Sequence, residues 1–104
     1  MKTIKVEELK QMIDNGSDFQ LIDVRNPGEF EDVNMNGILI PLPEISDHLE
    51  EIREDVPVVI HCRSGARSAA AILTLESLKP FQNLYNLEGG IMRWIEFNNQ
   101  NTDN

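Results

Sequence analysis

The only cysteine of this chain, Cys62, stands where an apolar run gives way to small residues and two arginines. The run at residues 58–61 predicts a strand, and the pattern from residue 68 onwards predicts a helix. A thiol in the turn between them faces backbone N–H groups without intrahelical partners and the positive end of the helix dipole. Arg63 and Arg67 add positive charge close to it in the sequence. Each effect lowers the pKa of a thiol, so the segment predicts a cysteine nucleophile in an anion-binding loop.

The other residues of this loop leave room for an anion. Gly65 allows backbone conformations that other residues avoid, so successive N–H groups can point inward. Ser64 and Ala66 are too small to fill the space, and Ser68 is expected to cap the helix and to reach into the loop. A lone cysteine is more often an inert buried side chain. These neighbours favour a catalytic role for Cys62 instead.

The two arginines of the loop have different expected roles. Arg67 stands at the predicted start of the helix, where it can brace the loop or neutralise an anion. Arg63 directly follows the cysteine and is expected to point outward and contact the substrate. The alternative for each is an arginine that is only solvated.

His61 precedes the cysteine and invites comparison with cysteine–histidine catalytic pairs. Successive strand residues point to opposite faces of a sheet, so His61 is expected to lie out of hydrogen-bonding reach of Cys62. The thiolate is therefore expected to be activated by the loop. Neither His61 nor His48 has a second ligand at metal-binding spacing, so the sequence predicts no metal site.

Asp23 and Arg25 end a neighbouring predicted strand at residues 19–25. A buried aspartate requires a partner. We expect an ion pair between Asp23 and Arg25 that braces the turns, with Glu29 joining it four residues later.

The rest of the chain alternates apolar strand patterns with helical patterns. This alternation predicts an α/β fold with a mostly parallel five-stranded sheet and helices on both faces. Ligands of such folds bind beyond the carboxyl ends of the strands, where Cys62 lies. Residues 3–13 are expected to hold a short strand followed by a helix, and residues 26–30 a turn and a brief helix start. Further strands are expected within residues 19–25, 38–43, 58–61 and 81–87, and further helices within 43–53, 68–78 and 91–97.

The composition bounds the remaining possibilities. The chain has 104 residues and a net charge of −9, which predicts one domain, over residues 1–97, and a polar, frayed tail at 98–104. The acidic balance argues against a nucleic-acid partner. No apolar run is long enough to cross a membrane, and no secretion signal is expected at the start. A single cysteine excludes an internal disulfide and fits a reducing cytoplasm, and any oxidised or persulfidated Cys62 must be discharged from outside the chain.

Three segments occur in order along the chain: residues 23–25 with Glu29 and Phe30, the loop 62–68, and residues 86–91 with Trp94. Through them the chain resembles the rhodanese-like, single-domain sulfurtransferase family over about residues 3–97. Any one of these segments is a weak signal, but all of them together, at the family's spacing, are specific.

The resemblance implies a persulfide mechanism without a bound cofactor. The Cys62 thiolate would attack the sulfane sulfur of a donor such as thiosulfate and release sulfite. The outer sulfur would rest among the N–H groups of the loop, in the manner of an oxyanion hole. A thiophilic acceptor, such as cyanide, a small thiol or a thiol-bearing protein, would then remove it in a second half-reaction.

Two other functions fit the same cysteine. One is that of a phosphatase or arsenate reductase, whose cysteine loops resemble this one but are a residue longer, whereas four residues separate Cys62 from Arg67 here. The other is that of a non-catalytic sulfur carrier or interaction module that docks a partner enzyme.

The chain departs from the family at residues 33–38, where the family usually has Gly-His-Ile-x-Gly-Ala. Only Gly37 is kept, and Asn34 replaces the histidine.

Overall fold

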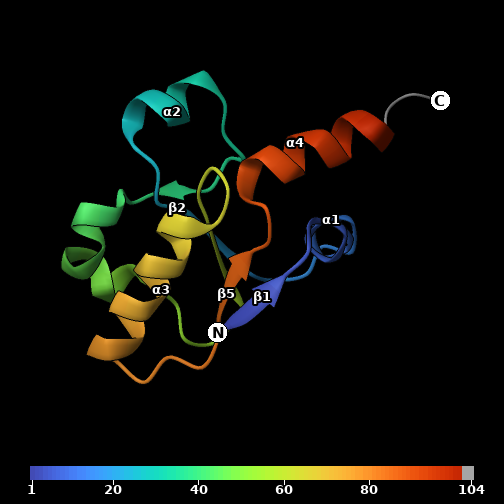
Figure 1. The fold of residues 1–104 in the computed structure, drawn as a ribbon. Helices are drawn as coiled ribbons and strands as arrows, with labels where there is room; N and C mark the ends of the chain where they lie inside the picture. Colours follow the sequence, from blue (N-terminus) through green and yellow to red (C-terminus); the bar gives the residue numbers. More distant parts are fainter. Residues whose placement is uncertain (102–104) are drawn as a thin grey trace.

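The protein is built around a five-stranded, wholly parallel sheet, which confirms the predicted fold class (Figure 1). The structure is a computed structural model and describes residues 1–101. The strand order is β1-β5-β4-β2-β3. The strands are β1 (Lys2–Ile4), β2 (Gln20–Asp23), β3 (Ile38–Leu39), β4 (Val58–His61) and β5 (Leu84–Leu87).

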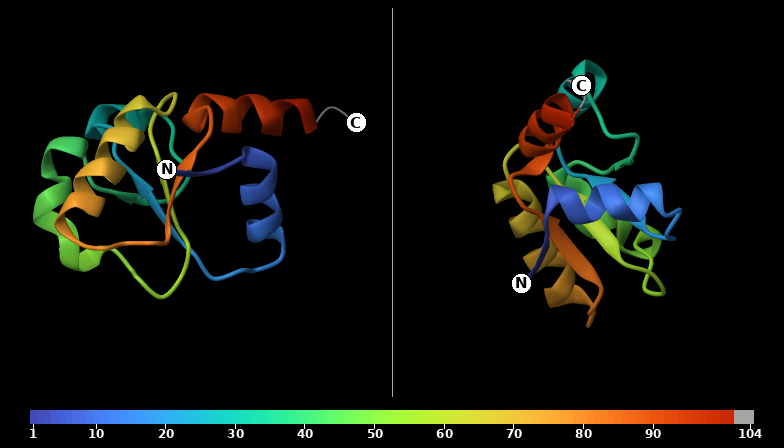
Figure 2. Two further views of the ribbon diagram at one scale, coloured as in Figure 1. Left: turned by 60° about the horizontal axis from the view of Figure 1, so that its bottom comes forward. Right: turned by 90° about the vertical axis from the view of Figure 1, so that its right-hand side faces the viewer.

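Helices cover both faces of this sheet (Figure 2). The 3₁₀ helix η1 and α3 lie on one face, and α1 and α4 lie on the other, whereas the short α2 follows the carboxyl end of β2. Parallel strands joined by crossover helices require this layering, because both faces of the sheet are apolar. The helices are α1 (Val6–Asp14), α2 (Pro27–Asp32), η1 (Leu42–Glu51), α3 (Ala66–Leu78) and α4 (Gly90–Asn101).

The central strand β4 is buried along its whole length and connects the two halves of the core. Val58 and Ile60 pack towards α3 and η1, whereas Val59 packs towards α1. Each such side chain contributes about 1.5–3 kcal/mol by leaving water. Cys62 follows directly and belongs to the α3 side of the core. The packing of β4 therefore fixes where the cysteine emerges.

Some element boundaries differ from the sequence predictions. The expected α-helix at residues 43–53 is a 3₁₀ helix, interrupted at His48, whose φ and ψ are −113° and 22°. Helix α3 begins at Ala66, two residues earlier than expected, because Gly65 adopts a left-handed conformation that lets the helix start there. Helix α4 continues past residue 97 to Asn101. The remainder of the predicted tail, 102–104, lies outside the described residues.

Candidate active site

The sulfur of Cys62 lies inside the loop that joins β4 to α3, and Cys62 is only 1% exposed. The backbone N–H groups of Gly65 and Ser68 donate to Sγ at 3.1 and 3.4 Å. Gly65 has a φ of 119°, a conformation that favours glycine and turns its N–H towards the sulfur. The loop thus surrounds one sulfur atom with donors, as expected for a site that holds an anion.

These donors decide the acidity of the thiol. Burial raises the pKa of Cys62, but hydrogen bonds from the Ser68 hydroxyl and from the backbone N–H groups of Ser68, Gly65 and Ser64 outweigh it. The net pKa lies below that of an ordinary cysteine. The loop therefore favours a thiolate, which is the nucleophilic form.

Ser68 is not the helix cap that the sequence predicted. The N-cap of α3 is Gly65, which makes no side-chain capping bond. Ser68 instead lies in the first turn of α3, with Oγ 3.4 Å from the Cys62 sulfur and 3.1 Å from the carbonyl oxygen of Gly65. The predicted cap is therefore wrong, whereas the prediction that the Ser68 hydroxyl reaches into the loop is confirmed.

Asn86, at the carboxyl half of β5, holds this loop from the side. Its Nδ2 donates to the carbonyl oxygen of Gly65 at 3.1 Å, and its Oδ1 lies 2.5 Å from Ser68 Oγ, whose single proton it shares with the Cys62 sulfur. Because the Gly65 carbonyl can only accept, the orientation of the amide is determined. The two residues that Asn86 contacts are among those whose N–H groups hydrogen-bond the sulfur. Asn86 has a residue type and a local sequence that predict no such role, although the carboxyl end of the strand next to β4 is where a residue that supports the loop would lie.

The first turn of α4 holds the loop from behind. The N–H groups of Ile91 and Met92 donate to the carbonyl oxygens of Cys62 and Arg63, at 2.9 and 3.2 Å. These bonds hold the two carbonyl groups of the loop against the start of α4.

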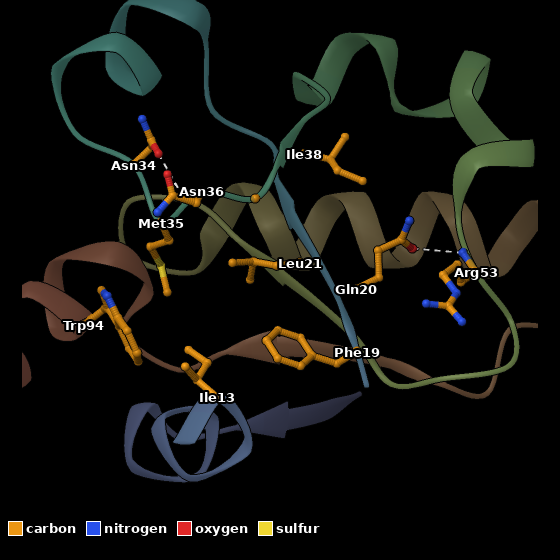
Figure 3. Close-up of a pocket in the computed structure, with 11 residues that line it drawn as sticks. Ile13, Phe19, Gln20, Leu21, Asn34, Met35, Asn36, Ile38, Arg53 and Trp94 are labelled. Atoms are coloured by element: carbon orange, nitrogen blue, oxygen red, sulfur yellow. Dashed lines mark hydrogen bonds between the residues drawn. The ribbon is translucent and has the colours of Figure 1, made fainter. Parts of the chain in front are cut away.

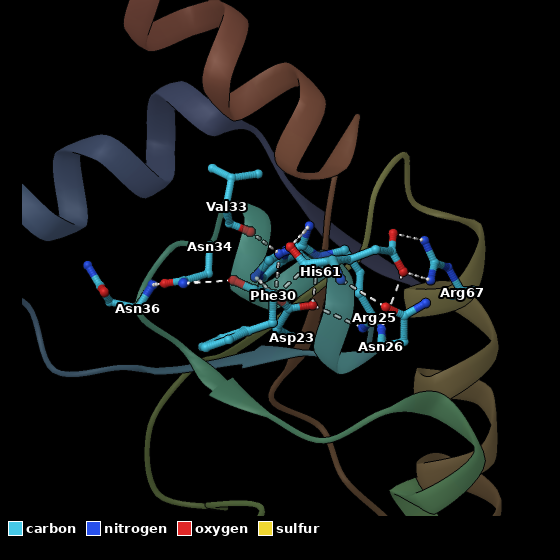
Figure 4. Close-up of polar contacts among 10 residues, drawn as sticks. Asp23, Arg25, Asn26, Phe30, Val33, Asn34, Asn36, His61 and Arg67 are labelled. Carbon is cyan, nitrogen blue, oxygen red and sulfur yellow. Dashed lines mark hydrogen bonds and ion pairs between the residues drawn. The ribbon is translucent and has the colours of Figure 1, made fainter.

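Arg67 is bound to Glu29 by two parallel hydrogen bonds of 2.7 and 2.9 Å (Figure 4). The bond to Arg67 is the main cause that lowers the pKa of Glu29 to about 2, so this carboxyl group is ionised at neutral pH. Arg63 is exposed and makes no ion pair among residues 1–101, and its Nε donates to the sulfur of Met92 at 3.1 Å. Of the two expected arginine roles, Arg67 has the position for bracing and Arg63 the position for contact with a substrate.

Asp23 and Arg25 form the expected buried ion pair, at 2.8 Å between Oδ2 and Nη2 (Figure 4). The guanidinium group of Arg25 also donates to the carbonyl oxygen of Val33 at 2.7 Å, which ties down the segment after α2. Glu29 joins this pair only through its carbonyl oxygen, 3.5 Å from Arg25, because its carboxylate is bound to Arg67.

His61 lies on the opposite face of β4 from Cys62, as strand alternation requires. It is fully buried, and its Nε2 is 3.8 Å from Oδ2 of Asp23. Burial lowers its pKa, so the ring is neutral at physiological pH. Neither ring nitrogen has a hydrogen-bond partner within the described chain. His61 is therefore not placed to act as a base for Cys62.

The segment that departs from the family pattern forms a local turn. Asn34 donates to the carbonyl oxygen of Phe30 at 2.9 Å and accepts from the N–H of Asn36 at 2.9 Å. Gly37 approaches the backbone of Leu21 so closely that a Cβ would lie 2.9 Å from its oxygen. This contact gives a physical reason for the glycine that is kept in the pattern.

Two pockets near this segment differ in their relation to Cys62. One, of about 690 Å³, opens between α1, α4 and β2, where Phe19 and Trp94 line it (Figure 3), and no residue of the loop 62–68 is among its lining residues. The other, of about 290 Å³, lies beside the loop and is bounded by Arg63 and by residues of α2 and α4. Of these two pockets, only the second borders the loop, through Arg63.

Residues 1–101 hold neither a metal-binding cluster nor a membrane-spanning helix. No group of three or more histidine, cysteine, aspartate or glutamate side chains in this range is arranged to hold a metal ion. No helix in the same range is long and apolar enough to cross a membrane.

Comparison with known proteins identifies the family of this chain. The sequence profile of the rhodanese-like domain matches residues 5–97. The chain belongs to the rhodanese-like domain family. This match confirms the resemblance that the sequence predicted. Relatives of the chain include proteins named as sulfurtransferases.

Individual rhodanese-like relatives match over most of the chain. A protein named "Sulfurtransferase" from Allochromatium vinosum is 36% identical, over 88% of this chain and 85% of its own length. The protein YqhL of Bacillus subtilis is 39% identical, over 90% of this chain and 72% of its own length. The crystal structure of a rhodanese-like domain protein from Staphylococcus aureus is 33% identical, covers 90% of this chain and 91% of its own, and has a TM-score of 0.80.

Proposed function

We propose that this rhodanese-like domain transfers sulfane sulfur through a persulfide on Cys62. The observation that carries the proposal is the position of the Cys62 sulfur, which accepts hydrogen bonds from two backbone N–H groups inside a loop of low exposure. A thiolate, and then the terminal sulfur of a persulfide, are anions that such donors stabilise.

The first half-reaction loads the cysteine. The Cys62 thiolate attacks the sulfane sulfur of a donor, thiosulfate or an organic persulfide. The new S–S bond forms at Sγ, the S–S bond of the donor breaks, and its electron pair leaves with sulfite or with a thiolate. Arg63, exposed at the rim of the loop, meets an anionic donor, while Arg67 and the Asp23–Arg25 pair hold the loop and its surroundings in place.

The second half-reaction unloads the cysteine. An external thiol, a thiol-bearing protein or cyanide attacks the outer sulfur, and the Cys62 thiolate is the leaving group. The acceptor is external because Cys62 is the only cysteine of the sequence. The chemistry needs no metal or organic cofactor, since the sulfur atom is carried by covalent attachment. A reducing cytoplasm, rich in thiols, is the compartment that suits this cycle.

A sulfur-carrier role is the second candidate, and it has an observation in its favour. The pocket beside Arg63 is rimmed by exposed apolar side chains, Val33 (40% exposed), Met92 (50%) and Ile95 (36%). Exposed apolar groups around a reactive residue suit contact with another protein. A carrier would accept and pass on sulfur only when its partner is bound.

Intact-mass spectrometry tests the proposal. The protein is incubated with thiosulfate or with the hydropersulfide of 2-mercaptoethanol, and we expect a gain of one sulfur atom. Cyanide should remove the added mass, and Cys62→Ser should never acquire it. No mass gain with either donor would refute sulfur transfer. Repeated turnover with small donors and acceptors would favour an enzyme, whereas a single loading event without turnover would favour the carrier.

A further inference from the structure

The two arginines of the loop differ in the charge that they can offer to a substrate. Arg67 is bound by both oxygens of Glu29, at 2.7 and 2.9 Å, a bidentate geometry that is among the strongest between side chains. Arg63 has no carboxylate partner among residues 1–101. The net charge of the Arg67–Glu29 pair is zero, because Glu29 remains ionised at neutral pH.

Glu29 is held in this position by more than Arg67. It is the third residue of α2, where its backbone N–H donates to Oδ1 of Asn26 at 2.8 Å. Its Oε1 accepts from the N–H of Asn26 at 3.3 Å, which completes a capping box. The carboxylate therefore reaches Arg67 from a fixed backbone, and the neutralisation of Arg67 is built into the fold.

The resulting charge balance is unfavourable for a dianion. The attacking group is itself a thiolate, the whole chain carries a net charge of −9, and Asp32 lines the pocket next to the loop. Against these charges only Arg63 is uncommitted within the described part of the loop. Thiosulfate brings two negative charges into this field, whereas an organic persulfide brings one or none. Repulsion at close range lowers the encounter and binding of the more highly charged donor.

The surroundings of Arg63 also suit an organic group. The pocket of about 290 Å³ beside it is lined by Val33, Ile91, Met92 and Ile95. Three of these are exposed large apolar side chains. Sulfite, the leaving group of thiosulfate, gains nothing from such a wall, whereas the carbon skeleton of a thiol leaving group can pack against it.

From this arrangement we propose that Glu29 is a specificity-determining residue, which neutralises Arg67 and thereby makes Cys62 select organic persulfides over thiosulfate. This inference rests on the sulfur transfer proposed above and narrows its donor. The favoured step is the attack of the Cys62 thiolate on the outer sulfur of R–S–SH. The bond from Sγ to that sulfur forms, the R–S bond to it breaks, and R–S⁻ leaves with the electron pair. The proton stays on the transferred sulfur.

The test compares Glu29→Gln with Glu54→Gln. Glutamine also serves in a capping box, so Glu29→Gln keeps the helix start and removes only the charge that neutralises Arg67. Glu54 pairs with Lys79 at 2.8 Å, with a carboxylate that is 55% exposed and on the other side of the fold from the loop. Its replacement changes the net charge by the same amount and is the matched control. The probes are thiosulfate and the hydropersulfide of 2-mercaptoethanol, with cyanide as acceptor.

We expect the wild type to have the higher kcat/KM for the hydropersulfide. In Glu29→Gln, kcat/KM for thiosulfate should rise about three- to tenfold, mainly through KM, while that for the hydropersulfide changes less than about twofold. Glu54→Gln should leave both values unchanged. A ratio of the two kcat/KM values that is the same in Glu29→Gln and the wild type would overturn the inference, even if both rates fell because the loop had loosened.

Arg63→Gln gives an independent reading that does not depend on Glu29→Gln. If Arg67 is neutralised, removal of Arg63 should lower kcat/KM for thiosulfate at least about tenfold and that for the hydropersulfide much less. Equal losses for both donors would contradict the inference. Failure of the wild type to accept sulfur from either donor would instead refute the proposed function, so the two failures are distinguishable.

Discussion

Gly90 lies directly against the backbone of Cys62, where a Cβ would come within 2.5 Å of the Cys62 carbonyl oxygen and 2.4 Å of that of Arg63. No real side chain fits at such distances. The contact lets the first turn of α4 donate hydrogen bonds to both carbonyl groups. The loop therefore has a rigid support behind it, and its N–H groups can be presented to the sulfur without reorganisation.

Gly90→Ala should therefore damage both folding and the site. The variant must move either the loop or α4, and its φ of +60° is unfavourable for alanine. We expect a loss of about 2 kcal/mol or more in the free energy of unfolding, measured by urea denaturation. We also expect slower alkylation of Cys62 at neutral pH.

Gly16→Ala is the matched control for this change. Gly16 has a similar φ of +68°, but nothing lies within 4 Å of its missing Cβ. It should lose only the cost of the backbone conformation, about 1 kcal/mol, and should keep the reactivity of Cys62. Equal effects of the two substitutions on that reactivity would show that the contact with the loop is unimportant.

The acidity of Cys62 gives a prediction about pH. Because its pKa is lowered in the folded protein, the thiolate persists as the pH falls below the pKa of a free cysteine, about 8.5. The rate of alkylation by iodoacetamide should thus reach half its maximum below that pH and decline as the pH falls through the folded pKa. The associated stability is present above the unfolded pKa and is lost over the same descent.

Ser68→Ala should raise the midpoint of this alkylation profile, since the hydroxyl contributes to lowering the pKa while the backbone N–H is retained. Ser77→Ala is the comparison, because that hydroxyl bonds only the Thr74 carbonyl, at 2.7 Å, on the exposed side of α3. A midpoint that is unchanged in Ser68→Ala would mean that the backbone donors act alone.

The amide of Asn86 is expected to matter for reactivity and not only for stability. Asn86→Ala removes the bonds to Gly65 and Ser68, two of the residues whose N–H groups hydrogen-bond the sulfur. With those groups less firmly aimed, alkylation of Cys62 should slow about three- to tenfold at neutral pH and its pH midpoint should rise.

Asn83, just before the same strand, offers a close control. Its amide also makes two hydrogen bonds, to the carbonyl oxygens of Arg53 and Val56 at 2.9 and 2.7 Å, but at the end of the sheet remote from Cys62. Asn83→Ala should destabilise the protein comparably, by about 1–3 kcal/mol, without shifting the pH profile. If both variants shift the profile alike, Asn86 is a structural residue only.

The local pattern of the sequence was enough to predict the parallel sheet and the position of Cys62. An apolar run followed by small residues determines where a strand ends, and strand alternation alone separates His61 from the cysteine. The ion pair of Asp23 and Arg25 was likewise accessible, because the two residues are neighbours in the chain and a buried carboxylate needs a partner.

Contacts between distant segments were not accessible in this way. Arg67 and Glu29 are 38 positions apart, and Asn86 is 18 positions from Ser68. Nothing in the local sequence of Glu29 shows whether its carboxylate binds Arg67 or Arg25, and Arg25 is nearer in the chain. The prediction of Ser68 as the helix cap was wrong for a related reason. Ser68 has the residue type of a cap, but Gly65, with its left-handed backbone, is the N-cap, so α3 starts earlier. Only the packing of β4, β5, α2 and α4 selects among such alternatives.

The buried pair of Asp23 and Arg25 leads to the largest expected loss of stability. Asp23→Asn keeps the shape of the side chain but leaves the Arg25 guanidinium, 3% exposed, without a counter-charge. An uncompensated buried charge costs about 3–5 kcal/mol, which urea denaturation would detect.

Asp14→Asn is the control. Asp14 pairs with Lys10 on the exposed side of α1, so its substitution should cost only a few tenths of a kcal/mol. Since Arg25 also holds the segment after α2 through Val33, the loss in Asp23→Asn should loosen Glu29 and, with it, the brace on Arg67. A cost for Asp23→Asn no greater than that for Asp14→Asn would show that Arg25 keeps its charge solvated, and that the pair does not support the loop.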